Sequence, residues 1–215
     1  RVGHGAKEIL DHLNIKQVSI DQFLNNSLTE AVYVQLDVLD YCERQDGTTL
    51  EKKDFFKHPE AYKSTFDRFT AVADFFIAGH FYGKGAPAFF TREQAKAPSF
   101  NLKVVADISC DIDGPIACTI RPSTIDFPIY GYDAETGTEV DFRSTSAIAV
   151  MAVDNLPCEL PKDASEGFGH TFVEKIIPAF FDNDSVGVLK RAKMTDNGQL
   201  TAAFSYLQDY VNGKE

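Results

Sequence analysis

Two short and almost entirely apolar runs, at residues 75–78 and 104–108, restrict the fold of this chain more than any other feature. A strand with an apolar residue at almost every position has both faces buried, which is typical of parallel strands covered by helices on the two sides of a sheet. Amphipathic helical patterns alternate with these runs along the sequence. That alternation predicts an α/β fold with an open, mostly parallel sheet and helices on both faces.

The chain opens on Arg1-Val2-Gly3-His4-Gly5-Ala6, directly before a helical pattern of apolar residues that predicts a helix over 6–13. Glycines at a helix start let the backbone approach a phosphate, and the helix N-terminus offers N–H groups and the positive end of its dipole. We interpret this segment as the second half of a dinucleotide-binding loop in a Rossmann-like domain. The first strand of that domain is then expected to be missing from the chain. The alternative is a simple turn, because a lone Gly-x-Gly is a weak signal.

The composition excludes several classes of protein. The chain has 215 residues, of which 44% are hydrophobic, enough for one large core. Its net charge of −11 disfavours nucleic-acid and anionic-membrane partners, because phosphates are held by clustered Lys and Arg. A small soluble ligand is expected instead. No run reaches transmembrane length, and no signal peptide is expected.

The cysteines favour a reducing compartment, so we expect a cytoplasmic protein. They show neither a Cys-x-x-Cys pair nor a spacing typical of metal ligands, and no metal site is predicted. The four are Cys42, Cys110, Cys118 and Cys158.

The remaining pattern predicts one nucleotide-binding domain over 1–200, followed by a C-terminal helix at 201–215. Strand-like segments are predicted at 31–36, 128–132 and 147–153. Helices are predicted at 53–69, from 161 towards 181 with a break near Pro178, and at 201–211.

Polar residues at the ends of predicted strands are candidate site residues, because ligands of open α/β sheets bind outside the carboxyl ends of the strands. Asp37 follows the strand at 31–36, from where its carboxylate could accept hydrogen bonds from the adenosine ribose and favour NAD over NADP. Asp40 is a competitor for that role, and a solvated turn is the plain alternative. Asp107 to Asp111 lie at the end of the run at 104–108, where Asp107 could instead only turn the chain.

The segment Gly79-His80-Phe81-Tyr82-Gly83-Lys84 comes directly after the first apolar run. An aromatic and glycine-rich loop at this position could form a wall of the cofactor site, and His80 could take part in proton transfer. The structural alternative is a histidine that only holds the loop by hydrogen bonds.

Four blocks of the sequence, in order, resemble the lysine-forming saccharopine dehydrogenases. They are similar above all to the lysine-2-oxoglutarate reductase portion of the bifunctional lysine-degradation enzymes. The most specific block is Val153-Asp154-Asn155-Leu156-Pro157-Cys158-Glu159-Leu160-Pro161, continuing to Glu166. The other three lie at 57–69, 78–82 and 104–111.

The resemblance implies a two-lobed enzyme, related to alanine dehydrogenase and transhydrogenase, whose nucleotide-binding lobe is the part represented here. Such enzymes interconvert saccharopine with lysine and 2-oxoglutarate by hydride transfer to or from a nicotinamide cofactor. The implied cofactor-binding residues are Arg1, Val2 and Gly3 at the pyrophosphate, with Gly79, His80, Phe81, Asp107, Ile108 and Ser109 along the ribose and nicotinamide. Asp154 and Asn155 are implied to lie near the active cleft.

Three departures from that family limit the prediction. The family's acid-base Lys and His come from an N-terminal lobe that no part of this chain matches, so we assign no catalytic acid or base. His80 stands where relatives commonly carry an aliphatic residue. The region of Asp37 is acidic where NADP-using relatives place a basic residue, so NAD is the predicted cofactor.

The predicted partners are therefore a small amino-acid substrate and the N-terminal lobe of the same protein. Two alternatives stay open: a noncatalytic nucleotide-binding module, and a dehydrogenase for another amino acid such as alanine.

Overall fold

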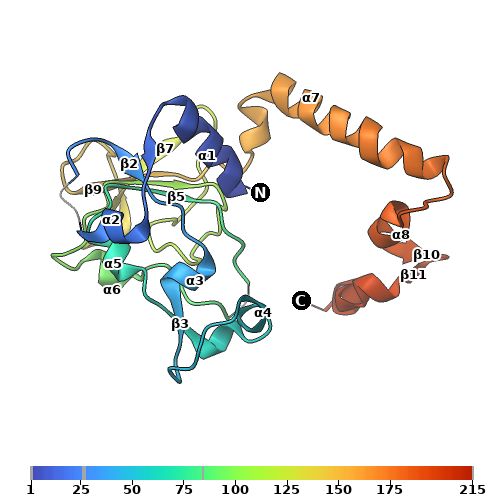
Figure 1. Cartoon of the computed structure of the whole chain (residues 1–215), viewed down its shortest axis with the longest axis horizontal. Helices are drawn as coiled ribbons and strands as arrows, with labels where there is room; N and C mark the ends of the chain where they lie inside the picture. Colours follow the sequence, from blue (N-terminus) through green and yellow to red (C-terminus); the bar gives the residue numbers. More distant parts are fainter. Residues whose placement is uncertain (1, 26–27, 84, 215) are drawn as a thin grey trace. The chain divides into compact units, whose positions relative to one another are not determined.

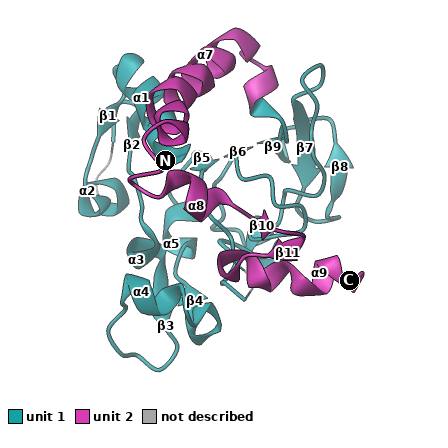
Figure 2. Cartoon of the chain, turned by 90° about the vertical axis from the view of Figure 1, so that its right-hand side faces the viewer, with its two compact units in different colours: residues 1–156 teal, residues 157–215 magenta. Residues whose placement is uncertain are grey.

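A computed structural model describes residues 2–25, 28–83 and 85–214. The chain forms two compact units, Arg1–Leu156 and Pro157–Glu215, coloured separately in Figure 2. The extent of the nucleotide-binding domain, which the sequence places at residues 1–200, stays a prediction.

A five-stranded mixed sheet forms the centre of the first unit (Figure 1). Its order is β5-β6-β9-β7-β8, in which β5, β6 and β9 run parallel while β7 pairs antiparallel with both β9 and β8. The strands are β5 (Phe75–Ala78), β6 (Val104–Asp107), β7 (Ile129–Asp133), β8 (Thr138–Val140) and β9 (Ala147–Met151). The α/β class and the strands at both apolar runs are confirmed, and the sheet is mixed, with two parallel and two antiparallel pairings. The Rossmann-like arrangement stays a prediction.

The antiparallel half of the sheet follows from a tight hairpin between β7 and β8. The Asp133 carboxylate accepts hydrogen bonds from the Thr136 backbone N–H at 2.9 Å and the Thr136 hydroxyl at 3.1 Å, which closes the turn. Gly137 then takes a φ of +70°, a conformation that favours glycine. Because Tyr130 and Tyr132 of β7 are both buried, the hairpin is anchored in the core instead of extending into solvent.

A separate two-stranded parallel sheet accompanies the first helix. Helix α1 (Val2–His12) confirms the predicted N-terminal helix and begins before residue 6. Strand β1 (Lys16–Gln17) pairs with β2 (Val32–Tyr33), and helix α2 (Ile20–Asn25) lies between them in the chain. The strand predicted at 31–36 therefore exists only as β2, and its partner is β1 instead of a strand of the five-stranded sheet.

The continuous helix predicted at 53–69 is wrong. This region contains α4 (Lys52–Phe55), the 3₁₀ turn η1 (Pro59–Ala61), strand β4 (Tyr62–Ser64) and α5 (Asp67–Thr70). Strand β4 pairs antiparallel with β3 (Cys42–Arg44), just after α3 (Val38–Tyr41). Tyr62 is buried opposite Arg44 and donates a hydrogen bond to the Asp54 carboxylate at 2.5 Å. These tertiary contacts override the helical spacing of the aromatic residues.

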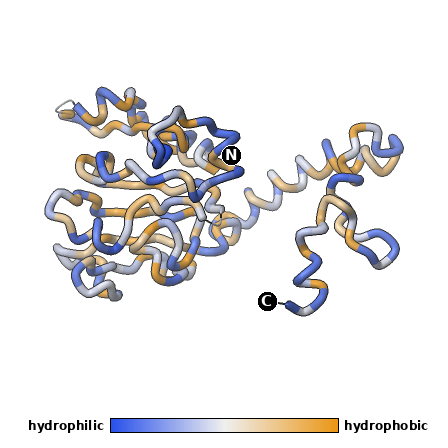
Figure 3. The backbone as a smooth tube through the Cα atoms, turned by 90° about the horizontal axis from the view of Figure 1, so that it is seen from below, coloured by the Kyte–Doolittle hydropathy of each residue, from blue (hydrophilic) through white to orange (hydrophobic). Residues whose placement is uncertain are grey.

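The main core lies around the parallel strands and is rich in aromatic rings. Phe66 is 3% exposed, and its ring centroid lies 4.8 Å from that of Phe76 and 4.9 Å from that of Phe89. Helix α6 (Arg92–Ala95) closes over this side with a reciprocal cap, in which the Thr91 N–H donates to Gln94 and the Gln94 N–H donates to Thr91. Apolar stretches along the strands of this unit appear orange in Figure 3.

The second unit is largely helical and begins within the short 3₁₀ turn η2 (Leu156–Cys158). Helix α7 (Pro161–Thr171) continues through a π-helical segment, η3 (Phe172–Ile176), into the 3₁₀ turn η4 (Ile177–Phe180), which agrees with the predicted break near Pro178. The predicted helix at 201–211 consists of the 3₁₀ segment η5 (Ala202–Leu207) and α9 (Gln208–Val211). The other elements are α8 (Val188–Ala192), β10 (Thr195–Asp196) and β11 (Gln199–Leu200). Among the residues described, no helix combines the length and apolarity needed to cross a membrane.

Candidate functional site

The start of α1 lies against the carboxyl end of β5. A Cβ atom on Gly79, the residue after β5, would come within 3.0 Å of Val2 Cγ1 and 3.1 Å of the Gly3 backbone nitrogen. Only a residue without a side chain allows this approach. The structure therefore brings together three of the predicted site residues, Val2, Gly3 and Gly79. Arg1 lies outside the described residues.

The loop after β5 is tied to the loop after β6 through His80 and Ser109. The Ser109 hydroxyl donates a hydrogen bond to the His80 carbonyl oxygen at 2.8 Å and lies 3.3 Å from His80 Nδ1. The His80 ring packs edge-on against Phe89, with 4.6 Å between ring centroids. Within the described part of the chain, His80 Nε2 is buried and has no hydrogen-bond partner. Phe81, the next residue, is 82% exposed.

Asp107, the last residue of β6, is completely buried. Its Oδ1 accepts hydrogen bonds from the backbone N–H groups of Ser109 at 3.1 Å and Cys110 at 3.0 Å. Its Oδ2 accepts from the Thr119 hydroxyl at 2.8 Å. This arrangement leaves no exposed carboxylate surface for a ligand. Sequence reasoning missed Thr119, because nothing in its surroundings distinguishes it from other threonines of that segment.

Two titratable groups of this cluster, His80 and Cys110, favour their neutral forms. Burial lowers the pKa of His80 below its ordinary value, and the negative charges of Asp107 and Asp111 oppose this only partly. Burial, together with the charges of Asp107, Asp154 and Asp111, raises the pKa of the Cys110 thiol. A neutral imidazole can accept or donate a hydrogen bond, whereas a protonated thiol is a poor nucleophile.

The lowered pKa of His80 predicts a loss of stability in acid. The unfolded chain binds a proton at His80 near the ordinary pKa of about 6.5, whereas the folded chain binds it only at lower pH. This contribution to stability is therefore complete above that value and is lost as the pH falls through the folded pKa. Between pH 7.5 and 5.5, we expect the urea midpoint to fall less in His80→Asn than in the wild-type protein. His12→Asn is the control, and an identical fall in all three proteins would contradict the prediction.

Asp37 lies in a different part of the fold. It precedes α3, where its backbone N–H donates to the Asp40 carboxylate at 2.7 Å, and its own carboxylate pairs with Lys52. Both side chains of that pair are about half exposed. No described contact joins Asp37 to the loops of His80 and Ser109. Its role at a ribose stays a prediction.

Asp154 and Asn155 follow β9 and are exposed. The loop from β6 reaches this neighbourhood, since the Cys110 thiol donates a hydrogen bond to the Ala152 carbonyl oxygen at 3.1 Å. The ends of β5, β6 and β9 therefore form one connected region.

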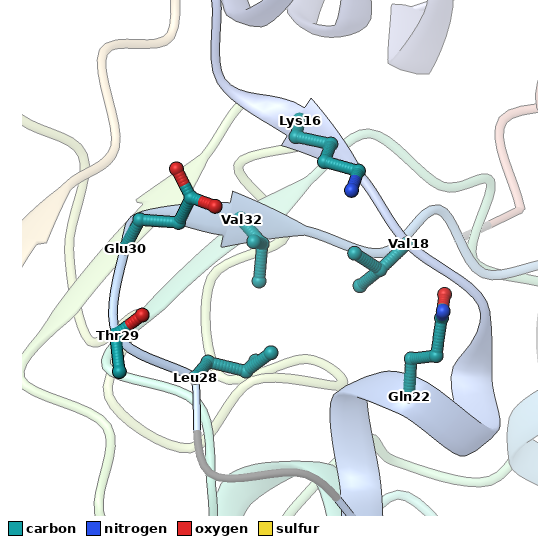
Figure 4. Close-up of a pocket in the computed structure, with 7 residues that line it drawn as sticks. All are labelled: Lys16, Val18, Gln22, Leu28, Thr29, Glu30 and Val32. Carbon is teal, nitrogen blue, oxygen red and sulfur yellow. The ribbon is translucent and has the colours of Figure 1, made fainter.

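Two hollows of the surface lie apart from this region. One of about 210 Å³ is formed around β1, β2 and α2, with Lys16 and Glu30 at its rim (Figure 4). The other, of about 470 Å³, lies along α1 and is lined by residues that include Lys7 and Asp11. Neither shares a lining residue with the His80 and Ser109 loops. No group of three His, Cys, Asp or Glu side chains in the described ranges is arranged to hold a metal ion.

Comparison with known proteins identifies relatives, although no family model matches the chain. The chain is 28% identical to the "Alpha-aminoadipic semialdehyde synthase" of Arabidopsis thaliana, over 92% of its own length and 20% of that protein. It is 28% identical to "Alpha-aminoadipic semialdehyde synthase, mitochondrial" of Mus musculus, over 100% of the chain and 26% of that protein. It is 30% identical to "Saccharopine dehydrogenase [NAD(+), L-lysine-forming]" of Schizosaccharomyces pombe, over 56% of the chain and 32% of that protein.

The chain thus spans between a fifth and a third of these curated relatives. The matches agree with the resemblance carried by the four sequence blocks. Over most of its length, the chain is homologous to the alpha-aminoadipic semialdehyde synthases and the saccharopine dehydrogenases.

Proposed function

We propose that this chain is the nucleotide-binding lobe of an NAD-dependent oxidoreductase that interconverts saccharopine with lysine and 2-oxoglutarate. The carrying observation is the close approach of the start of α1 to Gly79, beside the connected ends of β5, β6 and β9. A helix N-terminus facing the carboxyl end of a sheet is the arrangement that binds pyrophosphate in Rossmann-like folds. We propose that β1, β2 and the parallel strands of the main sheet are parts of such a fold.

Two features of the chain suit a dinucleotide. A Cβ on Gly79 would fill the space between β5 and α1, and the buried His80 Nε2 lacks a partner among the described residues. In this proposal, Val2 and Gly3 hold the pyrophosphate, while Gly79, His80, Phe81, Ile108 and Ser109 lie along the ribose and nicotinamide. Asp154 and Asn155 line the substrate side.

The bound nicotinamide would supply a carbon that accepts or gives a hydride. The residues of this chain would orient it and exclude water, since the loops of His80 and Ser109 are held together by hydrogen bonds. Because the Ser109 hydroxyl gives its proton to the His80 carbonyl oxygen, Nδ1 of the neutral ring is the donor towards Ser109, and Nε2 can accept a hydrogen bond. Proton transfer to and from the substrate is assigned to the N-terminal lobe that the resemblance implies.

The proposal is tested by titrating the intact gene product with NAD and with NADP in a calorimeter, followed by an absorbance assay for reduced cofactor after saccharopine is added. We expect NAD binding and saccharopine-dependent reduction. NAD binding without turnover would favour a dehydrogenase for another amino acid, such as alanine, or a noncatalytic module. No binding of either dinucleotide would contradict the proposal.

The proposed cofactor preference depends on Asp37. Replacing Asp37 with Ala should shift the NAD-to-NADP affinity ratio towards NADP by about tenfold. The reason is that a carboxylate at this position accepts hydrogen bonds from the ribose hydroxyls of NAD and repels the 2′-phosphate of NADP. The change also frees Lys52, its ion-pair partner, to meet the phosphate. Calorimetric titration with both dinucleotides measures the ratio. Asp40→Ala is the comparison, and a shift in that variant instead of Asp37→Ala would move the assignment to Asp40.

A further inference from the structure

The Asp107 carboxylate is the centre of a buried hydrogen-bonded turn. It accepts three hydrogen bonds from protein donors, two from backbone N–H groups and one from the Thr119 hydroxyl. Asp107 and Thr119 are both 0% exposed. A buried carboxylate with both oxygens occupied is stabilised where it is, and moving it towards a ligand would break these bonds.

This turn fixes the backbone that carries Ser109. Cys110 adopts a φ of +53°, a conformation that L-residues rarely take without a local hydrogen bond to hold it. The Asp107 Oδ1 supplies that bond, at 3.0 Å from the Cys110 nitrogen. The Cys110 thiol in turn reaches Ala152, at the end of β9. The loop after β6 is therefore held at both sides.

The held loop determines where His80 lies. Ser109 donates to the His80 carbonyl oxygen and lies beside Nδ1, so the backbone and ring of His80 are both positioned by Ser109. Phe89 restricts the ring from another side. These contacts define the direction of Nε2, which has no hydrogen-bond partner among the described residues.

We infer that Asp107 is a positioning residue that acts through Ser109 and His80 and makes no contact with the cofactor itself. The expected effect of Asp107 on the reaction rests on the proposed function. The expected effect of Asp107 on the conformation of the loop does not. The two effects can be measured separately.

The test uses Asp107→Asn in the intact gene product. Asparagine has the same shape as aspartate and keeps one acceptor oxygen. It loses the negative charge, and an NH2 group replaces the oxygen that faces Thr119. We expect kcat for saccharopine oxidation to fall at least tenfold while the Kd for NAD changes less than threefold. Thr119→Val removes only the third hydrogen-bond donor to Asp107, so it should lower kcat by a smaller factor than Asp107→Asn does. Thr119→Ser keeps the hydroxyl and should have the wild-type kcat.

Hydrogen exchange provides a readout that needs no cofactor. The amides of Ser109 and Cys110 should exchange at least tenfold faster in Asp107→Ala, which removes the oxygen that accepts from both, while those of β7 keep their wild-type rates. A tenfold rise in the Kd for NAD at unchanged kcat would overturn the inference and make Asp107 a ligand. Unchanged exchange at both amides would also overturn it. In a protein that binds no dinucleotide the proposed function fails, and the exchange rates alone decide whether Asp107 positions the loop.

Discussion

Replacing Gly79 with Val should weaken NAD binding by about tenfold or more. The new Cβ would meet the Gly3 backbone nitrogen at 3.1 Å and the Val2 side chain at 3.0 Å, so either α1 or the loop after β5 must move. Overpacking of this kind typically costs about 1–3 kcal/mol, and each 1.4 kcal/mol is a factor of ten in affinity. Calorimetric titration of the intact gene product with NAD measures the change.

Gly167→Val is the matched control for this prediction. Gly167 lies in α7, and a Cβ there meets no described atom within 4 Å. The control should therefore bind NAD as the wild-type protein does. Wild-type affinity in Gly79→Val would mean that the approach of α1 to β5 has no part in holding the cofactor.

The largest loss of stability is expected for Phe66→Ala. The Phe66 ring is 3% exposed and packs against four other aromatic rings, those of Tyr41, Phe69, Phe76 and Phe89, at centroid distances between 4.8 and 6.1 Å. Truncation removes these contacts and leaves a cavity under the parallel strands. Such changes typically cost about 3–5 kcal/mol of the free energy of unfolding. Urea denaturation followed by circular dichroism measures the loss.

Phe127→Ala provides the same chemical change at a site that is 76% exposed. It should change the free energy of unfolding by no more than about 0.5 kcal/mol. Equal losses in the two variants would show that the aromatic cluster does not determine the stability of this unit.

The sequence predicts the positions of the parallel strands well, because short apolar runs mark them. Strands β5 and β6 lie where the apolar runs at 75–78 and 104–108 are, within one residue, although Phe75 and Val104 are exposed. The direction of β7 was not predictable in the same way. Periodicity indicates that a strand exists, but its pairing depends on the turn at Gly137 and on the burial of the β7 tyrosines.

Aromatic spacing misled the prediction at 53–69. Tyr62, Phe66 and Phe69 stand at helical intervals, and all three are buried, but Tyr62 belongs to β4 while Phe69 belongs to α5. The same spacing of buried aromatic residues arises when a strand, a turn and a short helix all pack against one core. Local pattern cannot separate these cases, because Tyr62 pairs with Arg44 of β3, outside this segment, and because its bond to Asp54 forms only when the chain folds back between α4 and β4.

Part of the candidate site was also beyond sequence reasoning. The polar strand ends pointed to Asp107 and Ser109, and the loop after β5 pointed to His80. Their connection depends on Thr119, which lies twelve positions from Asp107 and carries no pattern that marks it. A residue that acts by filling a hydrogen-bond site in the interior becomes visible only when both partners are placed in space.

The order of strands in the mixed sheet has a consequence for how the chain reaches its fold. Strand β7 pairs with both β8 and β9, the two strands that follow it in the chain, whereas the pairing of β6 with β9 must enclose the whole β7–β8 hairpin. Closing a longer loop costs more chain entropy, and contacts that are near in sequence form earlier. The antiparallel half should therefore form first and serve as a template for the parallel half, whose strand ends carry the candidate site.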